Sequence, residues 1–150
     1  ELGFEKSFQS QTWVDWTCAH SELPVFAVGV YLAITHYGPG MIEKPWQVRP
    51  LFALWNLGLS IFSILGVIRL IPYLVDEVHN KGFHRAMCSQ DWYTVGSASF
   101  WVWVFVYSKI PELLDTVFLV VQKKRVIFLH WYHHTTVALY CWHALSYKIG

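Results

Sequence analysis

The sequence predicts an all-α membrane protein, built as a polytopic bundle of transmembrane helices. Charged residues make up only 14% of the chain and hydrophobic residues make up 55%, whereas a soluble domain carries about 25% charged residues. Aromatic residues make up 18%, including nine Trp and eight Tyr, and such amphipathic rings favour membrane interfaces. The net charge is +1, without the basic stripe that nucleic acid requires, so we expect no nucleic-acid partner.

Four apolar stretches give the expected helices, because a helix needs about 20 mostly apolar residues to cross a bilayer. The stretches cover approximately residues 20–37, 51–75, 92–121 and 126–147. Residues 1–22 predict either an amphipathic helix on the membrane surface or a lead-in without regular structure. Residues 38–40 (Gly-Pro-Gly) are expected to end the first helix, and a polar loop is expected at 76–91. We treat residues 1–150 as a single transmembrane domain.

The charges of the loops predict the orientation of the chain. The loops after the first and third stretches hold five basic residues against one acid, Glu43; the basic residues are Lys44, Arg49, Lys123, Lys124 and Arg125. An excess of Lys and Arg marks the cytosolic side, so these loops are predicted to be cytosolic. The N-terminus and the 76–91 loop then face the opposite compartment, which is oxidising if it is the lumen of the endoplasmic reticulum. Cys88 in that loop is expected to be a free thiol or to pair with a cysteine outside this chain.

A charged motif lies inside the third apolar stretch. At helical spacing Lys109, Glu112 and Asp115 share one face about 120° wide. Facing lipid, they would cost about 2.5–3.5 kcal/mol each, so they are predicted to face a protein interior or a water-filled cavity. One interpretation is a structural salt bridge between Lys109 and Glu112. The other is one wall of a reaction chamber.

A histidine motif begins the fourth stretch. His130, His133 and His134 share one helical face, and the short basic turn before them makes the two stretches antiparallel neighbours. The charged motif and the histidine motif are therefore predicted to face each other at one depth. The imidazoles fit two kinds of chemistry, namely metal ligation or nucleophilic and general-base catalysis.

The metal interpretation would make the protein a membrane di-iron desaturase or hydroxylase. Such an enzyme needs about eight histidines in several boxes. The remaining histidines form no second box; they are His20, His36, His79, His84 and His143. We therefore expect no metal site. The basic turn at 123–125 has its own alternatives, an anchor on anionic lipid headgroups or a contact with substrate phosphates.

These residues resemble a known family. Lys109-x-Pro-Glu-Leu-x-Asp-Thr116, a basic turn and then His130-Trp-Tyr-His-His134 are similar to the ELO family of very-long-chain fatty-acid elongases, the 3-oxoacyl-CoA synthases of the endoplasmic reticulum. The resemblance implies a multi-pass helix bundle, of which this chain would be the N-terminal part with about four of seven helices. It also implies decarboxylative condensation of malonyl-CoA with a long-chain fatty acyl-CoA.

The resemblance implies a role for each motif. His133 would take the acyl group from its thioester as an acyl-imidazole, while His130 and His134 would orient and polarise it. Glu112 and Asp115 would hold histidine N–H groups, with Lys109 in the same supporting wall. No cofactor would be needed. The expected partners are acyl-CoA, malonyl-CoA, the lipid bilayer, and the reductase and dehydratase of the elongation cycle.

Part of the family's machinery is expected to lie outside this sequence. A further catalytic histidine belongs to later motifs of the family, so the 150-residue chain by itself is predicted to be inactive. A non-enzymatic scaffold or transporter, with buried charges lining a pathway, is a third interpretation.

Overall fold

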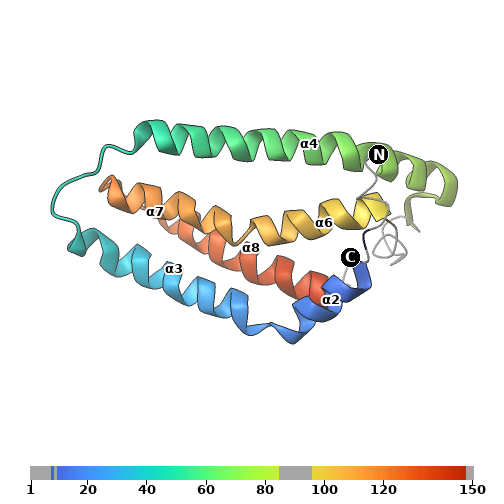
Figure 1. Cartoon of the computed structure of the whole chain (residues 1–150), viewed down its shortest axis with the longest axis horizontal. Coiled ribbons are helices and arrows are strands. Elements are labelled where there is room, and N and C mark those ends of the chain that lie inside the picture. Colours follow the sequence, from blue (N-terminus) through green and yellow to red (C-terminus); the bar gives the residue numbers. More distant parts are fainter. Residues whose placement is uncertain (1–7, 9, 85–95, 148–150) are drawn as a thin grey trace.

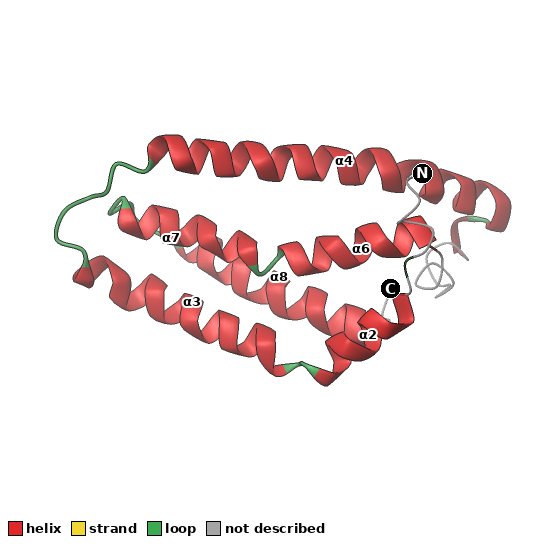
Figure 2. Ribbon diagram, in the orientation of Figure 1, coloured by secondary structure: helices red, strands yellow, loops and turns green. Residues whose placement is uncertain are grey.

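The computed structural model describes Phe8, residues 10–84 and residues 96–147. The described residues form helices and no strand. The helices in chain order are α2 (Ser10–Ala19), α3 (Glu22–Met41), α4 (Arg49–Lys81), α6 (Gly96–Ser108), the 3₁₀ helix η2 (Pro111–Leu113), α7 (Leu114–Val121) and α8 (Phe128–Tyr147). They run along one long axis, with α4 at the top of Figure 1, α3 at the bottom, and α6, α7 and α8 between them. Figure 2 shows that short loops join most of the helices, with a longer loop between α3 and α4.

The packing of the bundle depends on α8. Helix α8 contacts α2, α3 and α6, while α7 packs against α3 and α4 packs against α6. At the end near the chain termini, buried Val14, Val106 and Leu145 from three helices form a small apolar core. Aromatic rings extend this core, since Tyr107 lies 5.0 Å from Trp142 between ring centroids. Aromatic burial of this kind supplies most of the apolar contact area in a small bundle.

Helix α2 packs one face against α6 and α8. Of the two expectations for the N-terminal segment, the lead-in without regular structure is wrong for residues 10–19, while a position on the membrane surface stays a prediction. Thr17 of α2 is fully buried. Its hydroxyl contacts the Tyr107 hydroxyl at 2.8 Å, and its carbonyl accepts a hydrogen bond from Trp142 Nε1 at 3.1 Å. These bonds join α2 to α6 and α8.

Helix α4 presents an exposed apolar surface from Leu51 to Val75. None of its 33 residues is buried against the rest of the described chain. By length and composition α4 can cross a membrane, and α2 with α3 passes the same test as a pair bent by 59°. The expected spans at 92–121 and 126–147 remain predictions.

Two expected helix ends are wrong. Helix α3 continues through Gly38-Pro39-Gly40 to Met41. Gly38 instead allows close packing, since a Cβ on it would lie 2.8 Å from Val120 Cγ1. Helix α4 continues past Asp76 to Lys81. Side-chain pairs one turn apart stabilise this polar extension, including Lys81 with Glu77 at 2.6 Å. Residues 85–91 of the expected loop, which include Cys88, lie outside the described residues.

The third apolar stretch is broken where one straight helix was expected. Helix α6 ends at Ser108, the amides of Lys109 and Ile110 bond three residues back, and η2 begins at Pro111. Proline lacks the amide hydrogen and its ring crowds the carbonyl four residues earlier, so an α-helix cannot continue unchanged through it. The charged motif therefore spans a turn, a 3₁₀ helix and α7, and its residues do not share one regular helical face.

The contact between α3 and α7 can be tested with two glycines of the same helix. In Gly38→Ala the new methyl group meets the stiff, buried side chain of Val120. We expect a loss of about 1–3 kcal/mol in the free energy of unfolding, which is typical of overpacking. SDS-induced unfolding in mixed micelles measures it.

Gly29→Ala is the matched control, because nothing lies within 4 Å of a Cβ at Gly29. Alanine has the higher helix propensity, so this variant should be as stable as the parent or slightly more stable. Equal stability of the two variants would contradict the close α3–α7 contact.

Candidate active site

The turn between α7 and α8 brings the two sequence motifs together. Lys123 adopts a left-handed conformation with φ 55°, and its amide bonds to the Val120 carbonyl at 2.9 Å. The Lys124 amide bonds to the Leu119 carbonyl at 2.9 Å, which closes the end of α7. The chain then reverses into α8, so residues near the start of α8 lie beside residues of α7.

The three histidines of the box differ in exposure. His130 and His134 are half-buried, whereas His133 is exposed. The ring centroids of His130 and His134 are 4.5 Å apart, and those of His133 and His134 are 5.6 Å apart. The three imidazoles therefore form one cluster, with His133 on its accessible side.

A hydroxyl pair lies on the buried side of this cluster. The Thr116 hydroxyl of α7 is 2.9 Å from His130 Nε2 and 2.9 Å from the Tyr31 hydroxyl of α3. Thr116 is completely buried and Tyr31 is only 3% exposed. Tyr31 also lies beside His134, with 6.3 Å between ring centroids. Three helices thus contribute to the environment of the box.

Lys109 and Glu112 form the salt bridge that one interpretation of the charged motif predicts. Lys109 Nζ donates to both carboxylate oxygens of Glu112, at 2.7 and 2.8 Å. Ser108 Oγ also donates to Glu112 Oε1 at 2.8 Å. The Lys109 ammonium lies 4.1 Å from the centroid of the Phe105 ring, a cation–π contact. Each charge is therefore compensated inside the apolar segment.

Asp115 is held from a different helix. Trp55 Nε1 of α4 donates to Asp115 Oδ1 at 2.6 Å. Both side chains are half-buried. A charge-assisted hydrogen bond of this length offsets much of the cost of placing a carboxylate in an apolar bundle.

The structure brings the two motifs near each other but bonds them differently from the expectation. Asp115 lies within electrostatic range of His130, and the Lys109–Glu112 pair lies within electrostatic range of His134. Neither carboxylate makes a hydrogen bond to a histidine of the box in the described part of the chain, since each is bonded to other donors. Thr116 is the residue that contacts His130.

Sequence reasoning missed the roles of three residues. Thr116 belongs to the sequence motif, but spacing assigns it no function, and no motif includes Tyr31 or Trp55. Hydroxyl groups inside apolar helices are a signal for Thr116 and Tyr31, because buried polar groups need partners. No sequence signal pairs Trp55 with Asp115, which is 60 residues away.

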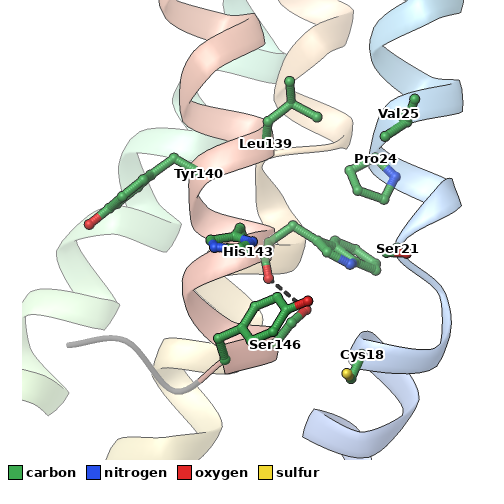
Figure 3. Close-up of a pocket in the computed structure, with 10 residues that line it drawn as sticks. Cys18, Ser21, Pro24, Val25, Leu139, Tyr140, His143 and Ser146 are labelled. Atoms are coloured by element: carbon green, nitrogen blue, oxygen red, sulfur yellow. Dashed lines mark hydrogen bonds between the residues drawn. The ribbon is translucent and has the colours of Figure 1, made fainter.

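Two hollows lie outside the histidine cluster. One, of about 390 Å³, has the exposed basic turn 123–125 on its wall together with His36 and Trp131. The other, of about 540 Å³, lies between the α2–α3 bend and the end of α8 (Figure 3). His143 lines this second hollow, away from the histidine box. Across the described residues, no three His, Cys, Asp or Glu side chains are placed to hold a metal ion together.

A profile of the ELO: GNS1/SUR4 family matches residues 16–150 of the chain. The chain belongs to this family. The resemblance stated from the two motifs is thereby confirmed, and so is the expected class of all-α membrane protein. The match includes the complete segment from Lys109 to His134. No solved structure matches the chain significantly.

Curated relatives of the ELO chain carry elongase names. The chain is 37% identical over 150 residues to very long chain fatty acid elongase 6 of Gallus gallus, and the match covers 99% of this chain and 56% of the relative. It is 43% identical over 129 residues to very long chain fatty acid elongase 4 of Trypanosoma cruzi, covering 83% and 45%. Fatty acid elongase 3 of Trypanosoma brucei brucei is 38% identical over 171 residues, covering 96% and 57%. The chain thus spans about half the length of these relatives.

The bond between α4 and α7 of this ELO chain can be tested by a double-mutant cycle. Trp55→Phe keeps an aromatic ring beside Phe118 but removes the indole N–H that bonds to Asp115. We expect a loss of about 1.5–3 kcal/mol in the free energy of unfolding, because the bond involves a charged acceptor. The measurement is the same SDS-induced unfolding, applied to Trp55→Phe, Asp115→Asn and the double variant.

The losses in the free energy of unfolding caused by the two substitutions should not be additive. Contacting residues typically show a coupling of about 0.5–3 kcal/mol. Additive losses in the double variant would show that Trp55 and Asp115 do not interact in the folded protein.

Proposed function

We propose that the full-length protein is a fatty-acid elongase condensing enzyme, a 3-oxoacyl-CoA synthase. It would join malonyl-CoA to a long-chain fatty acyl-CoA, with loss of carbon dioxide and of one CoA. The observation that carries this proposal is the family match over residues 16–150, which contains both the charged motif and the histidine box. The elongase names of relatives at 37–43% identity support the same conclusion.

The first step is transfer of the acyl group to His133. An imidazole nitrogen attacks the thioester carbonyl, the C–S bond breaks, and CoA leaves as its thiol after gaining the imidazole proton. An uncharged imidazole is a good nucleophile toward a thioester, which is a reactive acyl donor. The exposure of His133 supports this role, since its two neighbours in the box are half-buried and less accessible.

The second step forms the carbon–carbon bond. Malonyl-CoA loses carbon dioxide, and the electrons of the broken bond become an enolate. The enolate carbon attacks the acyl carbon and the acyl–nitrogen bond breaks, which releases 3-oxoacyl-CoA. The departing imidazole nitrogen takes up one proton from solvent, which restores the neutral imidazole. No electron acceptor or donor enters this balance, so we propose that the reaction uses no redox cofactor and no metal ion.

His130 and His134 are proposed to polarise the thioester carbonyl and to orient His133. The surrounding polar groups support this assignment, because each is already held by a partner: Glu112 by Lys109 and Asp115 by Trp55. These pairs fix charges at the edge of the box and stabilise its arrangement without taking part in the bond changes. Preorganised charges of this kind lower barriers because they do not reorient during reaction.

The membrane setting fits the substrates. We propose a multi-pass location in the endoplasmic reticulum membrane, with the basic loops cytosolic and the N-terminus lumenal. The histidine box then lies near the cytosolic side, where water-soluble CoA can reach it while the acyl chain stays among apolar helices. The 3-oxo product must next be reduced and dehydrated, so reductase and dehydratase enzymes are the proposed partners.

The proposed nucleophile can be tested by comparing two exposed histidines of α8. Full-length protein in microsomes is supplied with radiolabelled malonyl-CoA and a panel of acyl-CoAs. His133→Ala should lower elongation by at least about 100-fold, because it removes the group that carries the acyl chain. His143→Ala, on the same helix but away from the box, should keep the parent activity.

Three outcomes of this test would contradict the proposal. Undiminished elongation in His133→Ala would exclude His133 as the nucleophile. Modification of acyl-CoA that consumes oxygen and no malonyl-CoA would indicate a desaturase or hydroxylase. Absence of any turnover in the parent protein would favour a scaffold or transporter.

The basic turn offers a second test of substrate binding. Lys124 is exposed and borders the 390 Å³ hollow beside the basic turn, as well as a smaller hollow of about 230 Å³ that it lines together with Trp46 and Arg49. If the turn contacts CoA phosphates, Lys124→Gln should raise the KM for acyl-CoA several-fold with little change in kcat. The difference from the parent should shrink at high salt, because exposed charges are screened.

Lys81→Gln is the control, because Lys81 is an exposed lysine at the C-terminal end of α4, far from the basic turn. This variant should leave the KM for acyl-CoA unchanged. An unchanged KM in Lys124→Gln, together with weaker binding to anionic vesicles, would assign the turn to lipid headgroups instead.

A further inference from the structure

We propose that Thr116 and Tyr31 are positioning residues that set the tautomer of His130 and make it a hydrogen-bond donor toward the reacting groups. The inference rests on the proposed function for its catalytic consequence. Its structural part, the direction of the hydrogen bonds, stands on the geometry of the described residues alone.

The contacts form a continuous chain of three polar groups. Tyr31 Oη lies 2.9 Å from Thr116 Oγ1, and Thr116 Oγ1 lies 2.9 Å from His130 Nε2. The groups come from α3, α7 and α8. Thr116 has no exposed surface and Tyr31 has 3%. Water therefore does not compete for these bonds, and their direction is decided by the groups themselves.

The number of hydrogens limits the direction of the chain. The Thr116 hydroxyl has a single hydrogen and two lone pairs, so it can donate to only one of its two partners. A phenol is a stronger donor than an aliphatic hydroxyl, which favours donation from Tyr31 to Thr116. The Thr35 hydroxyl donates to the Tyr31 backbone carbonyl at 2.8 Å. With Tyr31 as the donor, the Thr116 hydrogen is left for His130 Nε2, and this is the direction of the proposed chain.

This direction determines where His130 carries its proton. A neutral imidazole that accepts at Nε2 carries hydrogen on Nδ1. Among the residues described, Nδ1 of His130 makes no hydrogen bond, so it remains the free donor of the ring. The neighbouring His134 ring is 4.5 Å away between centroids and His133 belongs to the same cluster. His130 Nδ1–H is thus available to a thioester carbonyl held at the box.

The consequence is a division of roles among the histidines. When His133 attacks the thioester, the carbonyl oxygen gains negative charge, and a fixed N–H donor stabilises that charge. Removing such a donor from an acyl-transfer site typically lowers kcat about 100-fold to 1000-fold. In this scheme His130 neither gains nor loses a proton. Thr116 and Tyr31 act through it and do not contact the substrate.

The test uses full-length protein with three substitutions. Thr116→Val removes the hydroxyl at nearly constant shape and should lower kcat about 10-fold to 100-fold, as is typical for loss of a group that orients a functional histidine. The KM for acyl-CoA should change little. Thr116→Ser restores the hydroxyl and should restore most of kcat. Tyr31→Phe should give an intermediate loss, because Thr116 keeps its bond to His130 but loses the donor that directs it.

A second measurement does not depend on activity. Ring nitrogen chemical shifts of ¹⁵N-labelled histidine report the tautomer directly, and the His130 signals are those absent in His130→Asn. The parent protein should show an unprotonated Nε2 and a protonated Nδ1. Thr116→Val should lose this preference.

Either measurement can overturn the inference. A protonated Nε2 on His130 in the parent protein would reverse the hydrogen-bond chain, and an unchanged kcat in a folded Thr116→Val variant would remove its catalytic consequence. If Thr116→Val does not fold, the kcat of Tyr31→Phe and the His130 tautomer in the parent protein still test the inference. If the parent elongates no acyl-CoA, the proposed function fails while the tautomer measurement stands.

Discussion

The hydroxyl of Thr116 joins three helices at one buried point. It contacts Tyr31 of α3 and His130 of α8 from its own position on α7. The same faces of α3 and α7 meet at Gly38 and Val120, where no room remains for a side chain on the glycine. Because α7 cannot move away from α3 without breaking both contacts, the position of His130 depends on the packing of these three helices.

A bundle of apolar helices can hold polar groups only if each has a partner, since an unpaired buried charge costs several kcal/mol. The charged motif meets that requirement in two ways. Lys109 and Glu112 neutralise each other across one turn, and Asp115 takes its donor from α4. The Trp55–Asp115 bond therefore also links α4 to α7, and both pairs hold fixed charges near the histidine box.

Much of the candidate site was predictable from local spacing. The histidines at positions 130, 133 and 134 lie on one helix, and a short turn makes that helix antiparallel to the one before it. The prediction of one shared helical face for the charged motif is wrong because of Pro111. Helical spacing assumes a regular α-helix, whereas the proline divides the segment into two α-helices and a 3₁₀ helix. The prediction is also wrong at Gly38: Gly-Pro-Gly predicts a helix end, whereas here the missing side chain allows two helices to approach.

The sequence by itself determined the membrane class, the helical architecture and the family, because composition, apolar runs and two adjacent motifs are local properties of the chain. Only the tertiary structure decided which groups hold one another. Trp55 pairs with Asp115 across 60 residues and Tyr31 reaches Thr116 across 85. Partners so distant in the chain carry no shared pattern, since what brings them together is the packing of α3, α4 and α7 and not the spacing of residues on any one helix.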